Sequence, residues 1–238
     1  MMIGSDPMKK QVYYVLLFVF ILLMILSLIS ILYWRKDNQK TKEIVSKEEI
    51  HLTVEDDRYQ LERDILKDNP DTVGWIIIKD TNIYYPVVQT DNNEYYLNHD
   101  FSHQWNDAGW IFMDYRNTMN DQNLILYGHH RRDGSMFGSL DSFFDQDYSQ
   151  KHNTLVFITL DDVSEYEIFS IYRSPADDSY LDIHFESFEE ELLKIKNKSE
   201  IPFENISQTS QILTLSTCHD NNRDRLVLHF YKKIERNA

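Results

Sequence analysis

The chain has 238 residues and a formal net charge of −15, with 13% aromatic residues and only 6 Gly and 5 Pro. This composition is that of a folded protein and excludes a disordered chain. Residues 37–238 hold 38 acidic and 20 basic residues, a net charge of −18. This negative charge argues against a protein that binds along the phosphates of a nucleic acid, because such a protein needs a basic stripe.

The first predicted element is a membrane-spanning helix. Residues 12–32 carry no charged side chain, and a helix of this length spans roughly 31 Å, the thickness of a bilayer core. Aromatic residues flank it as in interfacial belts: Tyr13, Tyr14, Tyr33 and Trp34. We predict an uncleaved anchor at residues 12–34. A cleaved signal peptide is the alternative, but it would have a shorter apolar region followed by small residues.

The N-terminal tail, residues 1–11, gives no clear orientation for this anchor. Basic residues lie on both sides of the apolar segment, two before it and four soon after it, so the positive-inside rule does not decide. Residues 1–7 are interpreted as an appended sequence or a misassigned start, because Met8-Lys9-Lys10 would make a natural beginning.

The remaining residues predict a stalk and one β-rich domain. Residues 35–72 are strongly charged and carry apolar residues at loosely helical spacing. They are interpreted as an extended, helical stalk followed by a helix that ends before Asn69-Pro70. Residues 73–238 form the predicted β-rich domain. Helices are expected around residues 93–97, 135–144 and 185–196. Short apolar runs predict strands, and together they favour a closed or nearly closed β-barrel with peripheral helices: residues 74–80, 82–89, 123–128, 153–160, 165–172, 211–217 and 225–231.

Cys218 is the only cysteine of the chain and follows the apolar run 212–217. A lone cysteine forms no internal disulfide. In a strand, Ile212, Thr214 and Ser216 would share one face, and Cys218 would lie at the strand end, where rigid supports often display reactive groups. The residues alone leave two interpretations equally open, a buried small hydrophobe and a reactive thiol.

A reactive thiol needs a base or a cation, and a donor for an oxyanion. His129 and His130 directly follow the apolar run that ends at Gly128, although for either histidine an ordinary loop role remains the alternative. Arg225 opens the run after the cysteine, so its guanidinium would lie near the thiol if the two runs pair. Arginine offers donors and does not act as a base.

Other polar residues give weaker signals. Asp114, Asp220 and Asp224 can orient a side chain, but in so acidic a protein a surface position is the commoner one. His99 and His103 are four residues apart without further ligands around them. No metal and no cofactor are therefore predicted.

The segment TLSTC (214–218), followed by Arg225 and preceded by YGHH (127–130), resembles the sortases, specifically class B. The resemblance covers about residues 74–230 and continues through four further segments: GWIIIKDTNIYYPVVQ (74–89), EYYLNHDF (94–101), GWIFMDYRN (109–117) and MFGSLDSF (136–143). It implies a mainly β fold, a closed eight-stranded barrel with peripheral helices. It also implies a membrane-anchored cysteine transpeptidase on the outer face of Gram-positive bacteria, without a cofactor.

The resemblance also implies site residues. By motif position, Cys218 would be the nucleophile, His129 the acid and base, and Arg225 the cation for the oxyanion or substrate, while His130 would take no part. Positions that would line the sorting-signal groove are Ser216, Tyr127, Leu97, Asn93 and Thr217. Two departures stand out. The interval between Cys218 and Arg225 is short for class B, which leaves Arg223 as a minor rival. His219 replaces the usual acidic or hydroxyl residue, and a second imidazole near the thiol complicates the pH profile.

The implied partners are surface proteins with a C-terminal sorting signal, cleaved after Thr through a Cys thioester, and a peptidoglycan-precursor or protein amine as acceptor. The membrane is a partner through the N-terminal helix, the catalytic domain would be extracytoplasmic, and nucleic acid is not a partner. The class suggests signals of the Asn-Pro-x-Thr or Ser-Pro-x-Thr type. Alternatives are a pilin-polymerising sortase, a hydrolytic cysteine peptidase and an inert membrane-anchored binding module with the same fold.

Overall fold

The computed structural model describes residues 7–46, 59–175, 180–204, 206–219 and 224–234. The chain divides into two compact units, residues 1–44 and residues 45–238. The first is dominated by one helix and the second contains the barrel, and each is described separately below.

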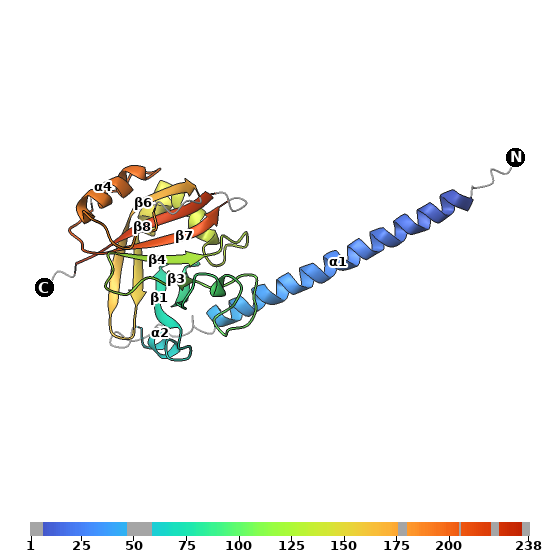
Figure 1. Ribbon diagram of the computed structural model, residues 1–238, viewed down its shortest axis with the longest axis horizontal. Helices are drawn as coiled ribbons and strands as arrows, with labels where there is room; N and C mark the ends of the chain where they lie inside the picture. Colours follow the sequence, from blue (N-terminus) through green and yellow to red (C-terminus); the bar gives the residue numbers. More distant parts are fainter. Residues whose placement is uncertain (1–6, 47–58, 176–179, 205, 220–223, 235–238) are drawn as a thin grey trace. The chain divides into compact units, whose positions relative to one another are not determined.

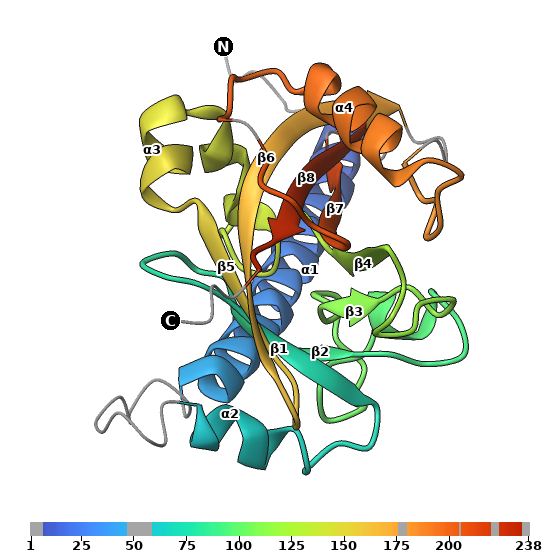
Figure 2. The same ribbon diagram turned by 90° about the vertical axis from the view of Figure 1, so that its left-hand side faces the viewer.

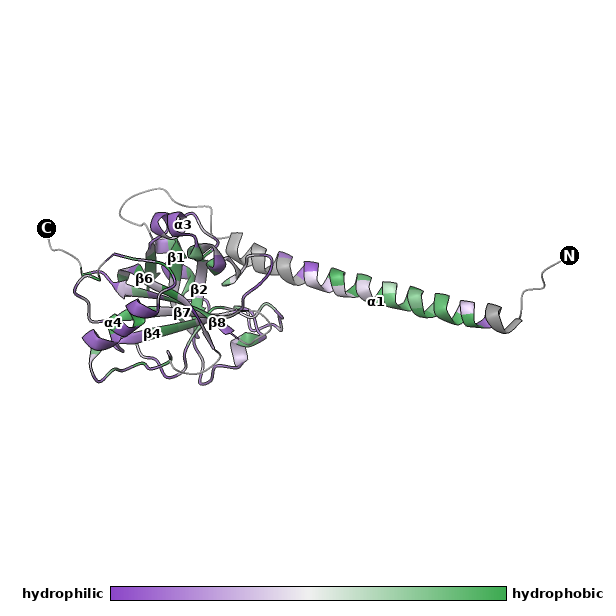
Figure 3. Cartoon of the chain, turned by 90° about the horizontal axis from the view of Figure 1, so that it is seen from above, coloured by the Kyte–Doolittle hydropathy of each residue, from purple (hydrophilic) through white to green (hydrophobic). Residues whose placement is uncertain are grey.

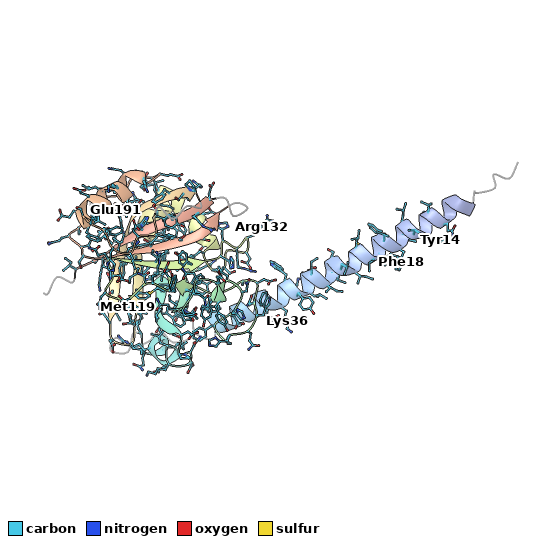
Figure 4. All side chains as sticks on the ribbon, viewed as in Figure 1. Tyr14, Phe18, Lys36, Met119, Arg132 and Glu191 are labelled. Atoms are coloured by element: carbon cyan, nitrogen blue, oxygen red, sulfur yellow. The ribbon has the colours of Figure 1, made fainter. Side chains whose placement is uncertain are left out.

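Helix α1 (Pro7–Ser46) is a single helix of 40 residues. Its stretch Gln11–Lys36 contains an 18-residue window with a mean hydropathy of 3.3 and is long and apolar enough to cross a membrane. The stretch is coloured as mainly hydrophobic in Figure 3. Tyr14 and Phe18 project outward from it (Figure 4). The predicted anchor at 12–34 lies within this helix.

The helix does not end with its apolar stretch. It continues to Ser46, into the segment that was expected to form a helical stalk. Residues 37–46 contain neither Gly nor Pro, the two residues least favourable inside a helix, so an already formed helix can continue through them. Stalk residues 47–58 lie outside the described residues, and α2 (Gln60–Ile65) then ends before Asn69-Pro70 as predicted.

Eight strands close into a barrel in the order β1-β2-β3-β4-β7-β8-β6-β5 (Figures 1 and 2). The β2–β3 and β4–β7 pairs are parallel and the others are antiparallel. This confirms the predicted closed eight-stranded fold. The strands are β1 (Thr72–Ile78), β2 (Tyr84–Val88), β3 (Phe112–Met113), β4 (Asn123–Gly128), β5 (Thr154–Ile158), β6 (Val163–Pro175), β7 (Ile212–His219) and β8 (Asp224–Lys232).

Strand β7 is buried on both faces, because one face carries a helix. Ile212 packs with Leu192 and Ile195 of α4 (Phe188–Lys198), which lies beside β6 (Figure 2). Leu213 and Leu215, on the opposite face, have no exposed area. The polar residues Thr214 and Ser216, which alternate with these leucines, are buried as well. By alternation, the helix-covered face continues from Ile212 through Thr214 and Ser216.

The short elements differ most from the predictions. The segments around 93–97 and 135–144 form 3₁₀ turns, η1 (Tyr95–Leu97) and η2 (Gly138–Phe144). Helix α3 (Gln146–Lys151) was not predicted, although the Asp145 side chain caps it by accepting from the Tyr148 amide at 2.8 Å. Strand β3 was also missed, because two residues give no periodicity.

Candidate active site

The register of three strands assembles the predicted catalytic positions. In the parallel β4–β7 pair, Gly128 lies opposite Thr217, so His129 and Cys218 are the next residue of each chain segment. In the antiparallel β7–β8 pair, Cys218 lies opposite Arg225. Figure 1 shows these three strands side by side. All three positions therefore meet at one end of the β4–β7–β8 sheet.

Two of the positions weighed from the sequence are only partly described. Cys218 and His219 are described as backbone positions of β7. The predicted rival cation Arg223 and the predicted orienting residue Asp220 lie outside the described residues. Asp224 is exposed and lies opposite His219.

His129 is held by the segment that contains Leu97. Its Nε2 lies 2.8 Å from the carbonyl oxygen of Leu97. Since a carbonyl only accepts, this nitrogen carries the hydrogen and donates it, and in the neutral ring Nδ1 keeps the lone pair. The half-buried imidazole is thus fixed in one tautomer, with Nδ1 able to accept a proton.

Gly109 makes this arrangement possible. It has φ +58°, a left-handed conformation that favours glycine. A Cβ at this position would lie 2.6 Å from the Tyr96 carbonyl oxygen, 2.8 Å from that of Leu97 and 3.0 Å from His129 Cδ2. The loop around Gly109 therefore packs against both the ring and the carbonyl that orients it.

The other histidines serve different contacts. His130 pairs through Nε2 with Asp141 of η2, so the two adjacent imidazoles bind different elements, as expected. His99 stacks on Tyr95 with ring centroids 4.1 Å apart and donates through Nδ1 to the Tyr95 carbonyl oxygen at 2.8 Å. Among the residues that the structure describes, no group of three or more His, Cys, Asp or Glu is arranged to hold a metal ion.

The predicted groove positions differ in exposure, since Ser216 is 1% exposed and Leu97 is 37% exposed. Tyr127 lies opposite Ser216 across the β4–β7 pair, and the Ser216 hydroxyl lies 2.9 Å from that of Tyr180. Leu97 is exposed beside His129. Thr217 is buried and, by alternation, is on the face opposite to Ser216.

Asp114 differs most from its expected surface position. Its side chain is 1% exposed. Oδ2 accepts from the Tyr127 hydroxyl at 2.8 Å and from Asn93 Nδ2 at 3.1 Å, and Arg116 donates to both oxygens at 2.9 Å. Burial alone would raise the pKa of Asp114, but the hydrogen bonds from Arg116 lower it below its usual value. Burial, followed by the charge of Asp114, raises the pKa of Tyr127.

Two residues around this site received no role from the sequence. Arg116 also donates to the Leu181 carbonyl oxygen at 3.0 Å, and Tyr180 precedes Leu181 and contacts Ser216. The FMDYRN segment was visible as part of the resemblance. Nothing in the pattern indicated that its Asp and Arg form a buried pair.

Comparisons with known proteins agree with this fold. The sortase domain model matches residues 76–232. Sortase B from Listeria monocytogenes is 37% identical over 210 residues, which covers 83% of this chain and 85% of that protein. The crystal structure of sortase B from B. anthracis in complex with AAEK1 has a TM-score of 0.71 at 32% identity and covers 84% of this chain and 99% of its own. A Staphylococcus aureus sortase B–substrate complex has a TM-score of 0.67 at 32% identity and covers 84% and 94%.

A closed barrel of this topology that brings a cysteine, a histidine and an arginine to one sheet end defines a class of cysteine acyl-transfer enzyme, and the chain belongs to the sortase family. Within the family it is a sortase B-type enzyme, a cysteine transpeptidase.

Proposed function

We propose that this enzyme cleaves a C-terminal sorting signal after Thr and transfers the acyl group to an amine of a cell-wall peptidoglycan precursor. Cys218 is the nucleophile, His129 the acid and base, and Arg225 the cation at the oxyanion. Tyr127, Ser216, Leu97 and Asn93 line the signal groove. The strand register carries the proposal, because it positions residues 129, 218 and 225 at one sheet end.

The reaction has two halves. The Cys218 thiolate adds to the Thr carbonyl carbon, and the peptide C–N bond breaks as the leaving amine takes a proton from His129. This leaves a thioester on Cys218. The acceptor amine then attacks the thioester carbon and loses a proton to His129, a new amide forms and the thiolate leaves. Protons and bonds balance over the cycle.

Arg225 stabilises the negative charge that develops on the carbonyl oxygen in both halves. Such a donor contributes about 3–4 kcal/mol, or ~10²–10³ in rate. Arginine suits this role because it stays protonated throughout and offers several donors in a fixed plane. Its position opposite Cys218 in the ladder is set by backbone hydrogen bonding.

The cellular setting belongs to the same proposal. Residues 12–34 anchor the chain in the cell membrane, residues 35–72 form the stalk, and residues 73–238 form an extracytoplasmic catalytic domain. The length and apolar character of α1 support the anchor. The solved Staphylococcus aureus sortase B–substrate complex supports surface proteins with a sorting signal as substrates.

The test uses the full chain in detergent micelles with fluorogenic pentapeptides of the sorting-signal type, with and without an added amine. We expect cleavage after Thr by the native enzyme, an amine-capped product, and no cleavage by Cys218→Ala. If the added amine changes neither the cleavage rate nor the product, the enzyme is a hydrolytic peptidase. Transfer only to a lysine-bearing protein, and not to a wall-precursor amine, would point to pilin polymerisation. Absence of any cleavage would contradict the enzyme's proposed substrate.

A further inference from the structure

A pocket opens beside the end of strand β6, next to the sheet end that carries the catalytic positions. It has a volume of about 310 Å³, within the range of small-ligand sites. Helix α4 lies beside β6 (Figure 2), and the pocket lies between the last residues of this strand and the residues where the helix ends. We call it the β6 pocket, and its lining residues are Tyr172, Arg173, Ser174, Pro175, Lys198 and Glu200.

Strand register places the β6 pocket next to the catalytic positions. Ser174 lies opposite Arg225 in the β6–β8 pair, and Arg225 lies opposite Cys218 in the β7–β8 pair. Directly opposed residues share a face of the sheet, so Ser174 is on the same face as position 218, two strand spacings or ~10 Å away. A short molecule seated in the pocket can therefore reach a thioester on Cys218.

One wall of the pocket, the Tyr172 side chain, is fixed by a chain of hydrogen bonds. The Tyr172 hydroxyl lies 3.0 Å from His229 Nε2, and His229 Nδ1 lies 2.8 Å from Thr214 Oγ1. Thr214 donates its hydrogen to Asn123 Oδ1 at 2.6 Å. The threonine oxygen therefore accepts from Nδ1–H, and Nε2 accepts from the tyrosine. All four side chains are buried, so the Tyr172 ring is held in one orientation.

The other wall is joined to β6 by hydrogen bonds. The Glu200 amide donates to the Ile171 carbonyl oxygen at 2.7 Å, and the Ile171 amide donates to Ser199 Oγ at 3.1 Å. Glu200 Oε1 accepts from the Arg173 amide and its Oε2 from Arg173 Nη1, both at 2.7 Å. The pocket is thus a preorganised part of the fold, in which the charges of Arg173 and Glu200 compensate each other.

Lys198 makes the lining positive. Its Nζ lies 5.6 Å from the centroid of the Tyr172 ring, a cation–π distance. The lining therefore carries two cations and one carboxylate, whereas residues 37–238 as a whole have a net charge of −18. A locally positive pocket on so acidic a domain favours a ligand with an anionic group.

Tyr180 separates the β6 pocket from the proposed signal groove. Its ring packs with Tyr172 and Val227, and its hydroxyl lies 2.9 Å from Ser216 Oγ. A sorting signal in the groove and a ligand in the pocket would thus lie on different sides of Tyr180 and meet at Cys218. The acceptor is the reactant that must reach the thioester while the signal still occupies the groove.

We propose that the β6 pocket binds the acceptor, and that Lys198 holds a carboxylate of this acceptor while the acceptor amine attacks the thioester on Cys218. This rests on the proposed function. The amine nitrogen bonds to the thioester carbon, its proton passes to His129 and the thiolate leaves, so the carboxylate takes no part in bond making. An extended chain spans ~3.3–3.6 Å per residue, so the acceptor class is a peptide whose amine and carboxylate are about three residues apart.

The experiment lets two acceptors compete for one thioester. The full chain in detergent micelles receives a signal peptide with equal concentrations of triglycine and triglycine amide, which have no side chains and differ only in the carboxylate. Mass spectrometry gives the ratio of the two transfer products. In the native enzyme we expect triglycine to be favoured about threefold at low salt, although the acidic domain as a whole would disfavour it. Salt at about 0.5 M should bring the ratio toward one.

Two lysines of α4 provide a matched pair of variants. Lys198→Glu should bring the ratio below one, and Lys198→Arg should keep the preference for triglycine. Lys194→Glu makes the same change of charge on the same helix, but Lys194 pairs with Glu191 at 3.1 Å and does not line the pocket. It should keep the native ratio, and thereby accounts for any general effect of the added negative charge.

Equal use of the two acceptors by the native enzyme would overturn the acceptor pocket, and so would a native ratio in Lys198→Glu. Cys218-dependent cleavage without transfer to either acceptor, or no Cys218-dependent cleavage at all, would instead overturn the proposed function itself. Should Lys198→Glu fail to fold, Lys198→Gln replaces it, with Lys194→Gln as its control. A ratio of about one in Lys198→Gln supports the role of Lys198, and a native ratio contradicts it.

Discussion

Cys218 and Arg225 are directly opposite each other in the antiparallel ladder of β7 and β8, and His219 and Asp224 form the next pair. The place of the arginine relative to the cysteine is therefore set by strand pairing. Arg223, the other basic residue of this stretch, lies outside the described residues. A ladder position suits a cation that must be held still during catalysis.

We expect Arg225→Ala to lower kcat by ~10²–10³, because it removes the donor that stabilises the developing oxyanion. Arg225→Lys restores the charge without the planar fork and should recover only part of this loss. Arg223→Ala should change kcat less than threefold. Steady-state kinetics on one fluorogenic signal peptide checks all three variants. A large loss in Arg223→Ala with an active Arg225→Ala would reverse the assignment.

The orientation of His129 predicts a specific effect at Gly109. Gly109→Ala introduces a Cβ against two carbonyl oxygens and the imidazole of His129, at a backbone φ of +58°, so we expect kcat to fall by about tenfold or more as the ring is displaced. Gly134→Ala is the control. It also has a positive φ, +76°, but the atom nearest to an added Cβ would be Asn82 Nδ2 at 3.3 Å.

Both glycine variants should lose roughly 1–2 kcal/mol of stability from backbone strain. Urea unfolding and kcat measured on the same preparations separate the two effects. Equal losses of kcat in Gly109→Ala and Gly134→Ala would mean that Gly109 acts through stability alone.

The buried imidazole of His229 predicts a pH dependence of stability. Its Nδ1 lies 2.8 Å from Thr214 Oγ1 and its Nε2 3.0 Å from the Tyr172 hydroxyl. Burial, followed by the charge of Lys198, lowers the pKa of His229 to about 3. Unfolding exposes a histidine with a pKa of about 6.5, so the unfolded state binds one more proton between these values.

Stability contributed by neutral His229 is thus complete above pH ~6.5 and declines as the pH falls toward 3, by up to about 1.4 kcal/mol per pH unit. His229→Gln, which keeps a donor and an acceptor but does not titrate, should flatten this part of the profile. Urea unfolding at several values between pH 4.5 and 7.5 gives the comparison. Parallel profiles for the two proteins would contradict the buried neutral state.

The Tyr180–Ser216 contact predicts a coupled loss of stability and substrate affinity. Tyr180→Phe leaves the buried Ser216 hydroxyl without this partner, at a cost of about 1 kcal/mol, and should raise KM for the signal peptide severalfold. Tyr166→Phe is matched, because its buried hydroxyl donates to Gln211 Oε1 at 2.7 Å. It should lower stability similarly and leave KM unchanged. An unchanged KM in Tyr180→Phe would remove Tyr180 from the groove.

Much of the barrel could be predicted, because its longer strands appear in the sequence as apolar, β-rich runs. The runs at 123–128, 211–217 and 225–231 became β4, β7 and β8 with boundaries shifted by at most two residues. The partner of each strand was harder, and the parallel β4–β7 pair that brings His129 beside Cys218 was not deducible from periodicity. The motif resemblance supplied that juxtaposition.

The features that could not be predicted from the sequence depend mostly on tertiary contacts. Asp114 resembles the other acidic residues of an acidic chain until Arg116 and Tyr127 are seen to surround it. Strand β3 is too short to show alternation. Helix α1 continues through part of the charged stretch that was expected to form the helical stalk.

The most direct test of the account is to trap the acyl intermediate. The full chain, native and Cys218→Ala, would be mixed with a cleavable signal peptide and analysed by intact-mass and peptide-mapping mass spectrometry, before and after hydroxylamine. The account predicts an adduct of the peptide's fragment ending in Thr, on Cys218 of the native chain alone, that hydroxylamine releases as an amine-capped product. Cleavage of the peptide by Cys218→Ala, or by native enzyme whose Cys218 has been alkylated, would contradict it.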